Sequence, residues 1–162
     1  EEEISLAIKN NFLPSSDSFV SLVRVAINFE NALEAKPILK ILNELGYEVG
    51  LNLMQSSGKS EQEYIDVSKQ IDKWSLVDIL YFADSFGNMS PEDISYIMSS
   101  LKKGWSGSLG FHSHNNKGFA LINSLKAIGS IEHEISGPSL VILSVKCLSM
   151  IDAPIAMAPI DG

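Results

Sequence analysis

The 162-residue chain is long enough for one domain, 1–162, and its 45% hydrophobic content is enough to build a core. A formal net charge of −8 argues against nucleic acid as a partner, because phosphate contacts need a surplus of Lys and Arg. No apolar run reaches the roughly 18–20 residues of a membrane span, the acidic start is unlike a signal peptide, and a lone Cys147 leaves no intrachain disulfide. We therefore expect a cytoplasmic protein with no membrane partner.

The first part of the chain predicts an extension followed by a strand and a helix. Residues 1–18 are weakly patterned and are expected to form an N-terminal extension, with a short helix near Glu3–Lys9. The run Phe19–Ile27 is too continuously apolar to have a solvated face, which predicts a strand covered on both sides. A helical stripe then spans Glu30–Leu45, where Pro37 marks either a kink or the true first turn.

Two further strand–helix units carry clear start signals. Their elements are expected at Val49–Met54, Ser60–Trp74, Asp78–Ala83 and Ser90–Lys103. Ser60 and Glu63 have the spacing of a capping box, in which each side chain satisfies a free backbone amide of the first helical turn. Ser90 followed by Pro91 gives a second helix an N-cap and a proline at its first position.

The last part of the chain is predicted less clearly. Ser108–His112 is expected to form a fourth strand, followed by a helix over Lys117–Ile128. Ile131–Ile135 predicts a weaker fifth strand, and the apolar stripe Leu140–Ile151 predicts a core helix.

Strands and helices therefore alternate, with most strands starting about 30 residues apart, which is typical of parallel βαβ units. No Gly-x-Gly-x-x-Gly follows any strand, so a dinucleotide-binding open sheet is disfavoured. The predicted fold class is α/β, a partial TIM (β/α)₈ barrel with about five βα units of parallel sheet.

Polar residues recur on one face of the predicted strands: Arg24, Asn28, Asn52, Asp84, His112 and His114. The last two are one residue apart on a strand, so both side chains share a face. Two imidazoles at the carboxyl end of a strand make half a divalent-metal site.

Each of these residues also has a structural interpretation. Two histidines at this spacing are more often hydrogen-bonded core or surface residues than metal ligands. Asp84 is about as well explained as the cap of its turn, Arg24 as the partner of a buried acid, and the two asparagines as interior polar filler.

Two motifs resemble one known family. The segments 82–94 (FADSFGNMSPEDI) and 110–118 (GFHSHNNKG), together with Arg24-Val25-Ala26, resemble the HMG-CoA-lyase-like family, the DRE-TIM metallolyases, over about residues 20–137. The Asp-Ser pair is most similar to the 4-hydroxy-2-oxovalerate aldolase branch. The sequence departs from the family where Pro138-Ser139-Leu140-Val141 replaces a glycine-rich loop, so residues 138–162 are expected to be a divergent C-terminal tail.

The resemblance implies a set of roles. His112 and His114 would bind Mn²⁺ or Mg²⁺, and Asp84 would be catalytic. Ser85 would lie near the substrate, and Asn116 stands where many relatives have Asp. Arg24, Asn28 and Asn52 are singled out by the polar strand face instead, so the expected substrate-binding residues are Ser85, Asn28, Asn52, Arg24 and Asn116. The family's third metal ligand, an Asp on its first barrel strand, has no counterpart in the sequence, and no residue is nominated as the base that takes the 4-hydroxyl proton.

Three functions follow as alternatives. The first is a metal-dependent aldolase that cleaves or forms a C–C bond of a 4-hydroxy-2-oxo acid through a pyruvate enolate, with a small 2-oxo acid as its substrate. The second is a truncated family member without catalysis of its own, serving as a structural or partner-binding module. Its open sheet edge would be covered by a homo-oligomer or by a partner chain, for example an aldehyde dehydrogenase. The third is a synthase of the same family that condenses an acyl-CoA with a 2-oxo acid.

Overall fold

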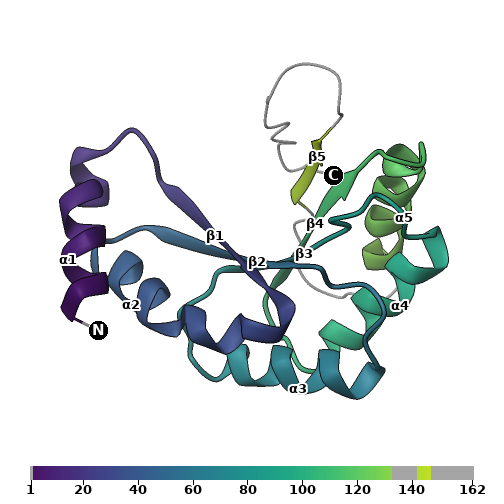
Figure 1. Cartoon of the computed structure of the whole chain (residues 1–162), viewed down its shortest axis with the longest axis horizontal. Helices are drawn as coiled ribbons and strands as arrows, with labels where there is room; N and C mark the ends of the chain where they lie inside the picture. Colours follow the sequence, from purple (N-terminus) through teal and green to yellow (C-terminus); the bar gives the residue numbers. More distant parts are fainter. Residues whose placement is uncertain (1, 133–141, 147–162) are drawn as a thin grey trace.

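A computed structural model describes residues 2–132 and 142–146 and shows an α/β fold built on one parallel sheet (Figure 1). The strands follow the chain order: β1 (Leu22–Asn28), β2 (Glu48–Met54), β3 (Ile79–Ala83), β4 (Ser108–His114) and β5 (Ile142–Lys146). The helices are α1 (Glu2–Asn11), α2 (Lys36–Glu44), α3 (Glu61–Asp72), α4 (Pro91–Lys102) and α5 (Ala120–Glu132), with short 3₁₀ segments η1 (Ser15–Asp17) and η2 (Phe29–Ala35). Within the described ranges, no helix is both long and apolar enough to cross a membrane.

The predicted alternation of strands and helices is confirmed over the first four units, and the fold is the predicted partial barrel. The predicted capping box forms, since Ser60 accepts the Glu63 amide while the Glu63 carboxylate accepts the Ser60 amide. The predicted N-cap Ser90 also forms, and with Asp93 it makes a second capping box that was not predicted. Pro37 lies in the first turn of α2, after the 3₁₀ segment, so it starts a helix rather than kinking one.

Two predictions near the carboxyl end are wrong. Ile131 and Glu132 continue helix α5 instead of starting a strand, and the rest of the predicted strand 131–135 lies outside the described residues. The predicted helix 140–151 contains strand β5 at Ile142–Lys146, which pairs in parallel with β4. A short apolar run fits both the helix and the strand template, so periodicity alone does not decide between them.

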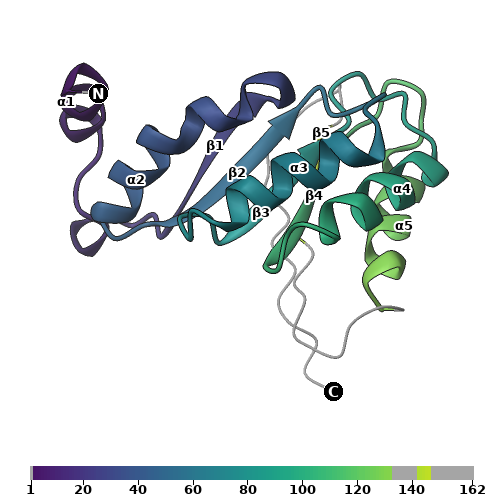
Figure 2. The same ribbon diagram turned by 90° about the horizontal axis from the view of Figure 1, so that it is seen from below.

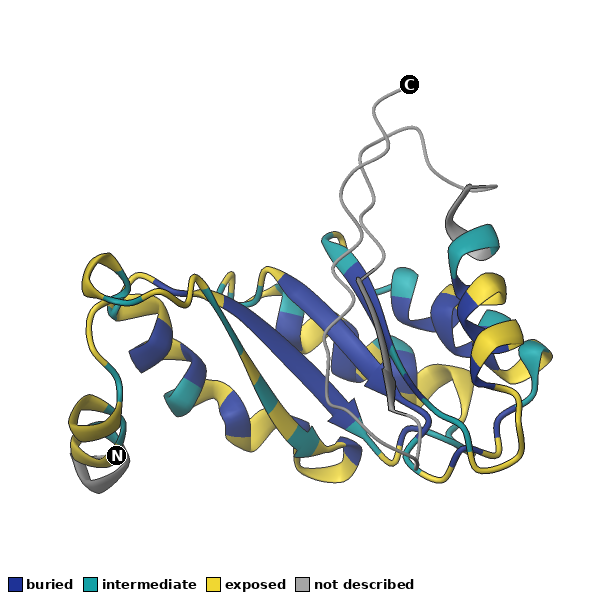
Figure 3. Ribbon diagram, turned by 90° about the horizontal axis from the view of Figure 1, so that it is seen from above, coloured by how far each residue is buried: buried dark blue, intermediate teal, exposed yellow. Residues whose placement is uncertain are grey.

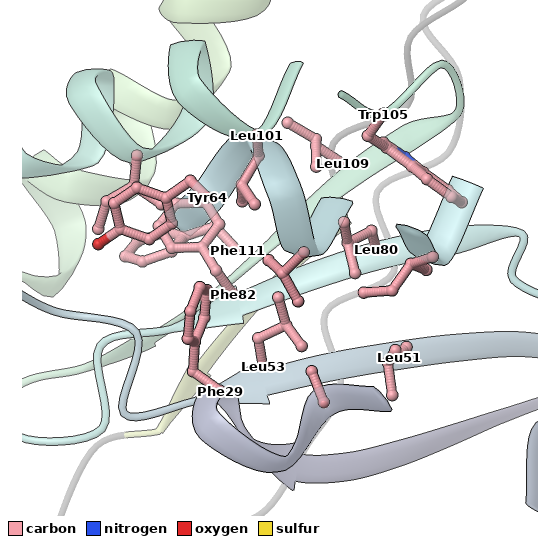
Figure 4. Close-up of a cluster of buried hydrophobic side chains, with 14 of the residues drawn as sticks. Phe29, Leu51, Leu53, Tyr64, Leu80, Phe82, Leu101, Trp105, Leu109 and Phe111 are labelled. Atoms are coloured by element: carbon pink, nitrogen blue, oxygen red, sulfur yellow. The ribbon is translucent and has the colours of Figure 1, made fainter. Parts of the chain in front are cut away.

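The core lies between the sheet and the helices along one of its faces (Figures 1 and 2). Alternate residues of the central strands, such as Leu51, Leu80 and Phe111, point into it and are completely buried. Figure 4 shows these side chains packed with Tyr64 and Leu101 from α3 and α4. This burial of apolar surface is the main source of stability for the fold.

Strand β1 differs from the prediction that both of its faces are covered. Arg24, Ala26 and Asn28 are exposed, whereas the alternate residues are partly buried against the core. β1 is the outermost strand at one side of the described sheet, and Figure 3 shows the buried residues concentrated in the central strands. The apolar run of β1 therefore predicted the strand but not how many neighbours cover it.

Candidate metal centre and substrate site

Two histidine side chains converge at the carboxyl end of β4. His112 and His114 lie on the same face, as the strand period requires. Their Nε2 atoms are 3.0 Å apart, the ring centroids are 4.9 Å apart, and the ring planes are inclined at 78°. Both residues are partly exposed, so a ligand can reach them. This arrangement suits two imidazole ligands of one divalent ion.

Asp84 follows β3 at the same edge of the sheet. Its backbone N–H donates to the carbonyl of His112 at 2.9 Å, which joins the two strand ends. The completely buried carboxylate accepts the backbone amides of Asn88 at 3.0 Å and Met89 at 3.2 Å, one on each oxygen. The structure thus gives Asp84 a loop-closing role, and the predicted catalytic role stays a prediction.

Ser85 lies next to Asp84 and joins this loop to β2. Its Oγ accepts the backbone N–H of Gln55 at 2.9 Å. A serine hydroxyl that accepts one hydrogen bond still has its own proton to donate. Ser85 can therefore offer a donor to a ligand oxygen, although its predicted contact with substrate is not tested by the structure.

The loops after β3 and β4 pack directly on each other. Gly87 has φ +60°, and a Cβ at this position would lie 2.6 Å from the backbone nitrogen of Asn116, so only glycine fits here without strain. The amide of Lys117 donates to the Gly87 carbonyl at 3.1 Å, and the buried Asn123 side chain donates to the Met89 carbonyl at 2.8 Å. Asn116, a predicted substrate contact, is exposed on this joined rim.

The sheet face that carries the histidines has an aromatic floor. The ring of Tyr81 lies between two glycines of the neighbouring strands: a Cβ at Gly50 would be 2.9 Å from the ring, and one at Gly110 would be 2.1 Å from it. Tyr81 is only 1% exposed. Sequence reasoning missed this residue; the available signal was the glycine in each flanking strand, which becomes readable once the strand register is known.

Two predicted substrate contacts lie beside this floor. Asn52 is the direct neighbour of Tyr81 in the strand register and is 4% exposed, and its Oδ1 has no hydrogen-bond partner among the described residues. The Arg24 guanidinium carbon lies 5.2 Å from the Tyr81 ring centroid. A buried polar atom without a partner is costly, so Asn52 is well placed to accept a hydrogen bond from a ligand. Asn28, the last residue of β1, is three strands away from His112 along the same edge.

The residues present supply part of a metal site. His112 and His114 provide two nitrogen donors, but no group of three or more His, Cys, Asp or Glu side chains is placed to hold a metal within the part of the chain that the structure describes. Mn²⁺ and Mg²⁺ favour oxygen ligands, so two imidazoles fit such an ion only as one side of a larger ligand set.

Solved structures with the same architecture include aldolase and carboxyl transferase domains. The N-terminal domain of a candidate aldolase from Bacteroides vulgatus matches 88% of this chain and 44% of its own, with a TM-score of 0.69 and 27% identity. The carboxyl transferase domain of Rhizobium etli pyruvate carboxylase, determined with pyruvate, matches 90% of this chain and 24% of its own, with a TM-score of 0.68. At 14% identity the second likeness concerns the fold alone.

Two relatives found by sequence have the same name. A 4-hydroxy-2-oxovalerate aldolase of Geobacillus genomosp. 3 is 32% identical over 76% of this chain, and that of Carboxydothermus hydrogenoformans is 35% identical over 66%. The chain spans about a third of the length of these relatives, 36% and 32% respectively. Residues 10–137 match the HMGL-like family, and with this match over most of its length the chain belongs to the HMGL-like family.

Proposed function

We propose that the protein is a metal-dependent aldolase that cleaves or forms a C–C bond of a 4-hydroxy-2-oxo acid. Pyruvate is one product of the cleavage and one substrate of the reverse reaction. The observation that carries this proposal is the convergence of the His112 and His114 Nε2 atoms at the carboxyl edge of the sheet. The carboxyl edge is where parallel α/β folds place their active sites. The aldolase relatives at about 30% identity support the same reaction class.

In this proposal His112 and His114 would hold Mn²⁺ or Mg²⁺ as two nitrogen ligands. Such an ion would supply Lewis-acid stabilisation of negative charge on the substrate's carbonyl oxygen. Asp84 fixes the loop between β3 and α4, which keeps the neighbouring Ser85 at the rim.

The remaining predicted residues bind the substrate. The Ser85 Oγ accepts the backbone N–H of Gln55. In this proposal the Ser85 hydroxyl proton is donated to a substrate oxygen. Arg24 supplies positive charge on the sheet face for the substrate carboxylate, and Asn52 offers its unpartnered Oδ1. Asn28, three strands from His112, and the exposed Asn116 stay predictions as substrate contacts.

Metal titration of the purified chain tests this proposal. Wild-type protein should bind Mn²⁺ and release pyruvate from a 4-hydroxy-2-oxo acid. His112→Ala removes a direct ligand and should weaken Mn²⁺ binding by more than about a hundredfold, beyond the 10–100-fold typical of residues that only support a ligand. His133→Ala is the matched control because it removes the chain's third imidazole. Equal Mn²⁺ affinity of wild type and His112→Ala would exclude the metal-centre assignment.

A second candidate is a structural or partner-binding module without catalysis of its own. Two observations favour it: the described residues lack a third metal ligand, and the sheet ends at a half-exposed β1. A homo-oligomer or a partner chain such as an aldehyde dehydrogenase would then cover that edge. This candidate predicts no turnover by the chain alone and activity only after the partner is added. The acyl-CoA synthase alternative and the cytoplasmic location stay predictions.

A further inference from the structure

Two residues other than glycine have a left-handed backbone among the described residues, Gln55 with φ 54° and Ser75 with φ 51°. They lie at opposite ends of the strands. Gln55 follows the carboxyl end of β2, and Ser75 lies between α3 and the amino end of β3. L-amino acids with side chains rarely adopt this conformation, so each position needs a physical reason.

Ser75 has a common structural reason. Its amide donates to the carbonyl of Asp72 at 3.2 Å, and a left-handed residue that closes the last turn of a helix is a frequent way for a helix to end. Gln55 follows a strand, where no such helix end requires a left-handed residue. Strained residues of this kind cluster at ligand-binding sites, where the surrounding structure holds them in place.

The surroundings of Gln55 do hold it in place. Its backbone N–H donates to Ser85 Oγ at 2.9 Å. The next residue, Ser56, is fixed twice, because its hydroxyl donates to the Leu53 carbonyl and its own carbonyl accepts the Tyr64 hydroxyl. These bonds over-determine the turn and keep the left-handed conformation.

The left-handed turn also decides where the Gln55 side chain goes. Leu51 and Leu53 point into the core, so a strand continued to residue 55 would send that side chain to the same buried face. Gln55 is instead exposed, at the edge where His112 and His114 meet.

The distance from the histidines suggests which part of a ligand Gln55 contacts. β2 is two strands from β4, and neighbouring strands lie about 4.8 Å apart, so the backbones that carry Gln55 and the histidine pair are separated by about 10 Å across the sheet. Pyruvate bound at the histidines would not span this gap, but the far end of a longer 2-oxo acid would approach it. A carboxamide carries both hydrogen-bond donors and an acceptor.

We propose that Gln55 is a specificity-determining residue that hydrogen-bonds the C4 oxygen of the 4-hydroxy-2-oxo acid. This inference rests on the proposed aldolase function. It assigns Gln55 to the part of the substrate that distinguishes a longer acid from pyruvate.

The test compares Gln55→Gly with Ser75→Gly in calorimetric titrations with pyruvate and with 2,4-dioxopentanoate, in the presence of Mn²⁺. The second probe keeps an oxygen at C4 but has no 4-hydroxyl proton to lose, so it cannot undergo aldol cleavage. We expect Gln55→Gly to bind 2,4-dioxopentanoate about tenfold more weakly than wild type, the equivalent of one lost hydrogen bond, and to bind pyruvate equally well. Ser75→Gly should bind both probes like wild type.

Urea unfolding of both variants shows whether a weaker binding comes from a destabilised fold. Glycine accepts a positive φ, so neither variant should have a lower unfolding midpoint than wild type. Unchanged binding of 2,4-dioxopentanoate by Gln55→Gly, or an equal loss for both probes, would overturn the role of Gln55 while leaving the aldolase proposal in place. Failure of wild-type protein to bind pyruvate would overturn the aldolase proposal, and the inference with it.

Discussion

The two faces of the sheet use the same strands for different purposes. On the helix-covered face, residues such as Phe82 and Phe111 are completely buried, with ring centroids 4.9 Å apart. On the other face, the residues next to them in sequence are Tyr81 and His112, which lie with Asn52 among polar groups and glycines. The alternation of a strand therefore separates stability from function one residue at a time.

This separation has a physical basis. The helix-covered face excludes water, so a polar side chain there would lose hydrogen bonds that an apolar neighbour cannot replace. The opposite face carries Arg24 exposed at β1 and the partly exposed histidines at β4, where charge and imidazole nitrogens keep access to solvent or ligand. Substitutions on the first face should therefore change folding. On the second face, substitutions of the exposed or partly exposed residues should change binding, whereas the buried Tyr81 and its flanking glycines also contribute to folding.

The largest expected effect comes from the helix-covered face. Phe82→Ala should lower the free energy of unfolding by about 3–5 kcal/mol, because it removes a buried ring and leaves a cavity against Phe111. Urea unfolding measures this loss. Phe19→Ala is the matched control, since Phe19 is exposed and its loss should change stability by less than about 0.5 kcal/mol. A loss below about 1 kcal/mol for Phe82→Ala would contradict the assignment of this face as the core.

A smaller effect is expected from the floor of the opposite face. Gly110→Ala places a Cβ 2.1 Å from the Tyr81 ring and should lower the free energy of unfolding by about 1–3 kcal/mol through overpacking. Gly129→Ala is the control in helix α5, where a Cβ meets no heavy atom within 4 Å, and it should stabilise by about 0.5–1 kcal/mol. Combining Gly110→Ala with Tyr81→Leu should cost less than the sum of the two single changes, because they share one contact. Strict additivity would show that the ring does not occupy this space.

The helix-covered face was largely predictable from sequence. Continuous apolar runs located β2, β3 and β4. The capping box at Ser60 located the start of α3, and the N-cap Ser90 with Pro91 located the start of α4. Local signals suffice for these elements because the apolar period and the cap chemistry depend on residues close together in sequence. Local signals failed for β5, whose short apolar run also fits a helix.

The opposite face was predictable only in part. The His-x-His spacing correctly gave a shared face and edge for His112 and His114, because strand parity is local. The burial of Tyr81 between two glycines depends on the register of three strands, which no local pattern contains. The left-handed turn at Gln55 also had no signal, since neither Gly nor Asn stands there.

The smallest expected effect is on the pKa of two tyrosines, one associated with each face of the sheet. Burial raises the pKa of Tyr64, on the helix-covered face, to about 12. Burial also raises the pKa of Tyr81, while the positive charge of Arg24 acts to lower it. A tyrosine whose pKa is raised in the folded state stabilises the protein fully below its unfolded pKa of about 10, and this contribution is lost as the pH rises toward 12.

Phenolate absorbance during an alkaline titration can separate the two tyrosines. Tyr64→Phe and Tyr81→Phe should each remove one late-titrating group and part of the fall in stability above about pH 10. Arg24→Gln removes the charge beside Tyr81, so it should raise the pKa of Tyr81 further and leave that of Tyr64 unchanged. An unchanged Tyr81 pKa in Arg24→Gln would show that the guanidinium does not lie over the ring in solution. The proposal that Arg24 binds the substrate carboxylate on this face would then lose its support. The assignment of the apolar core on the other face would be unaffected.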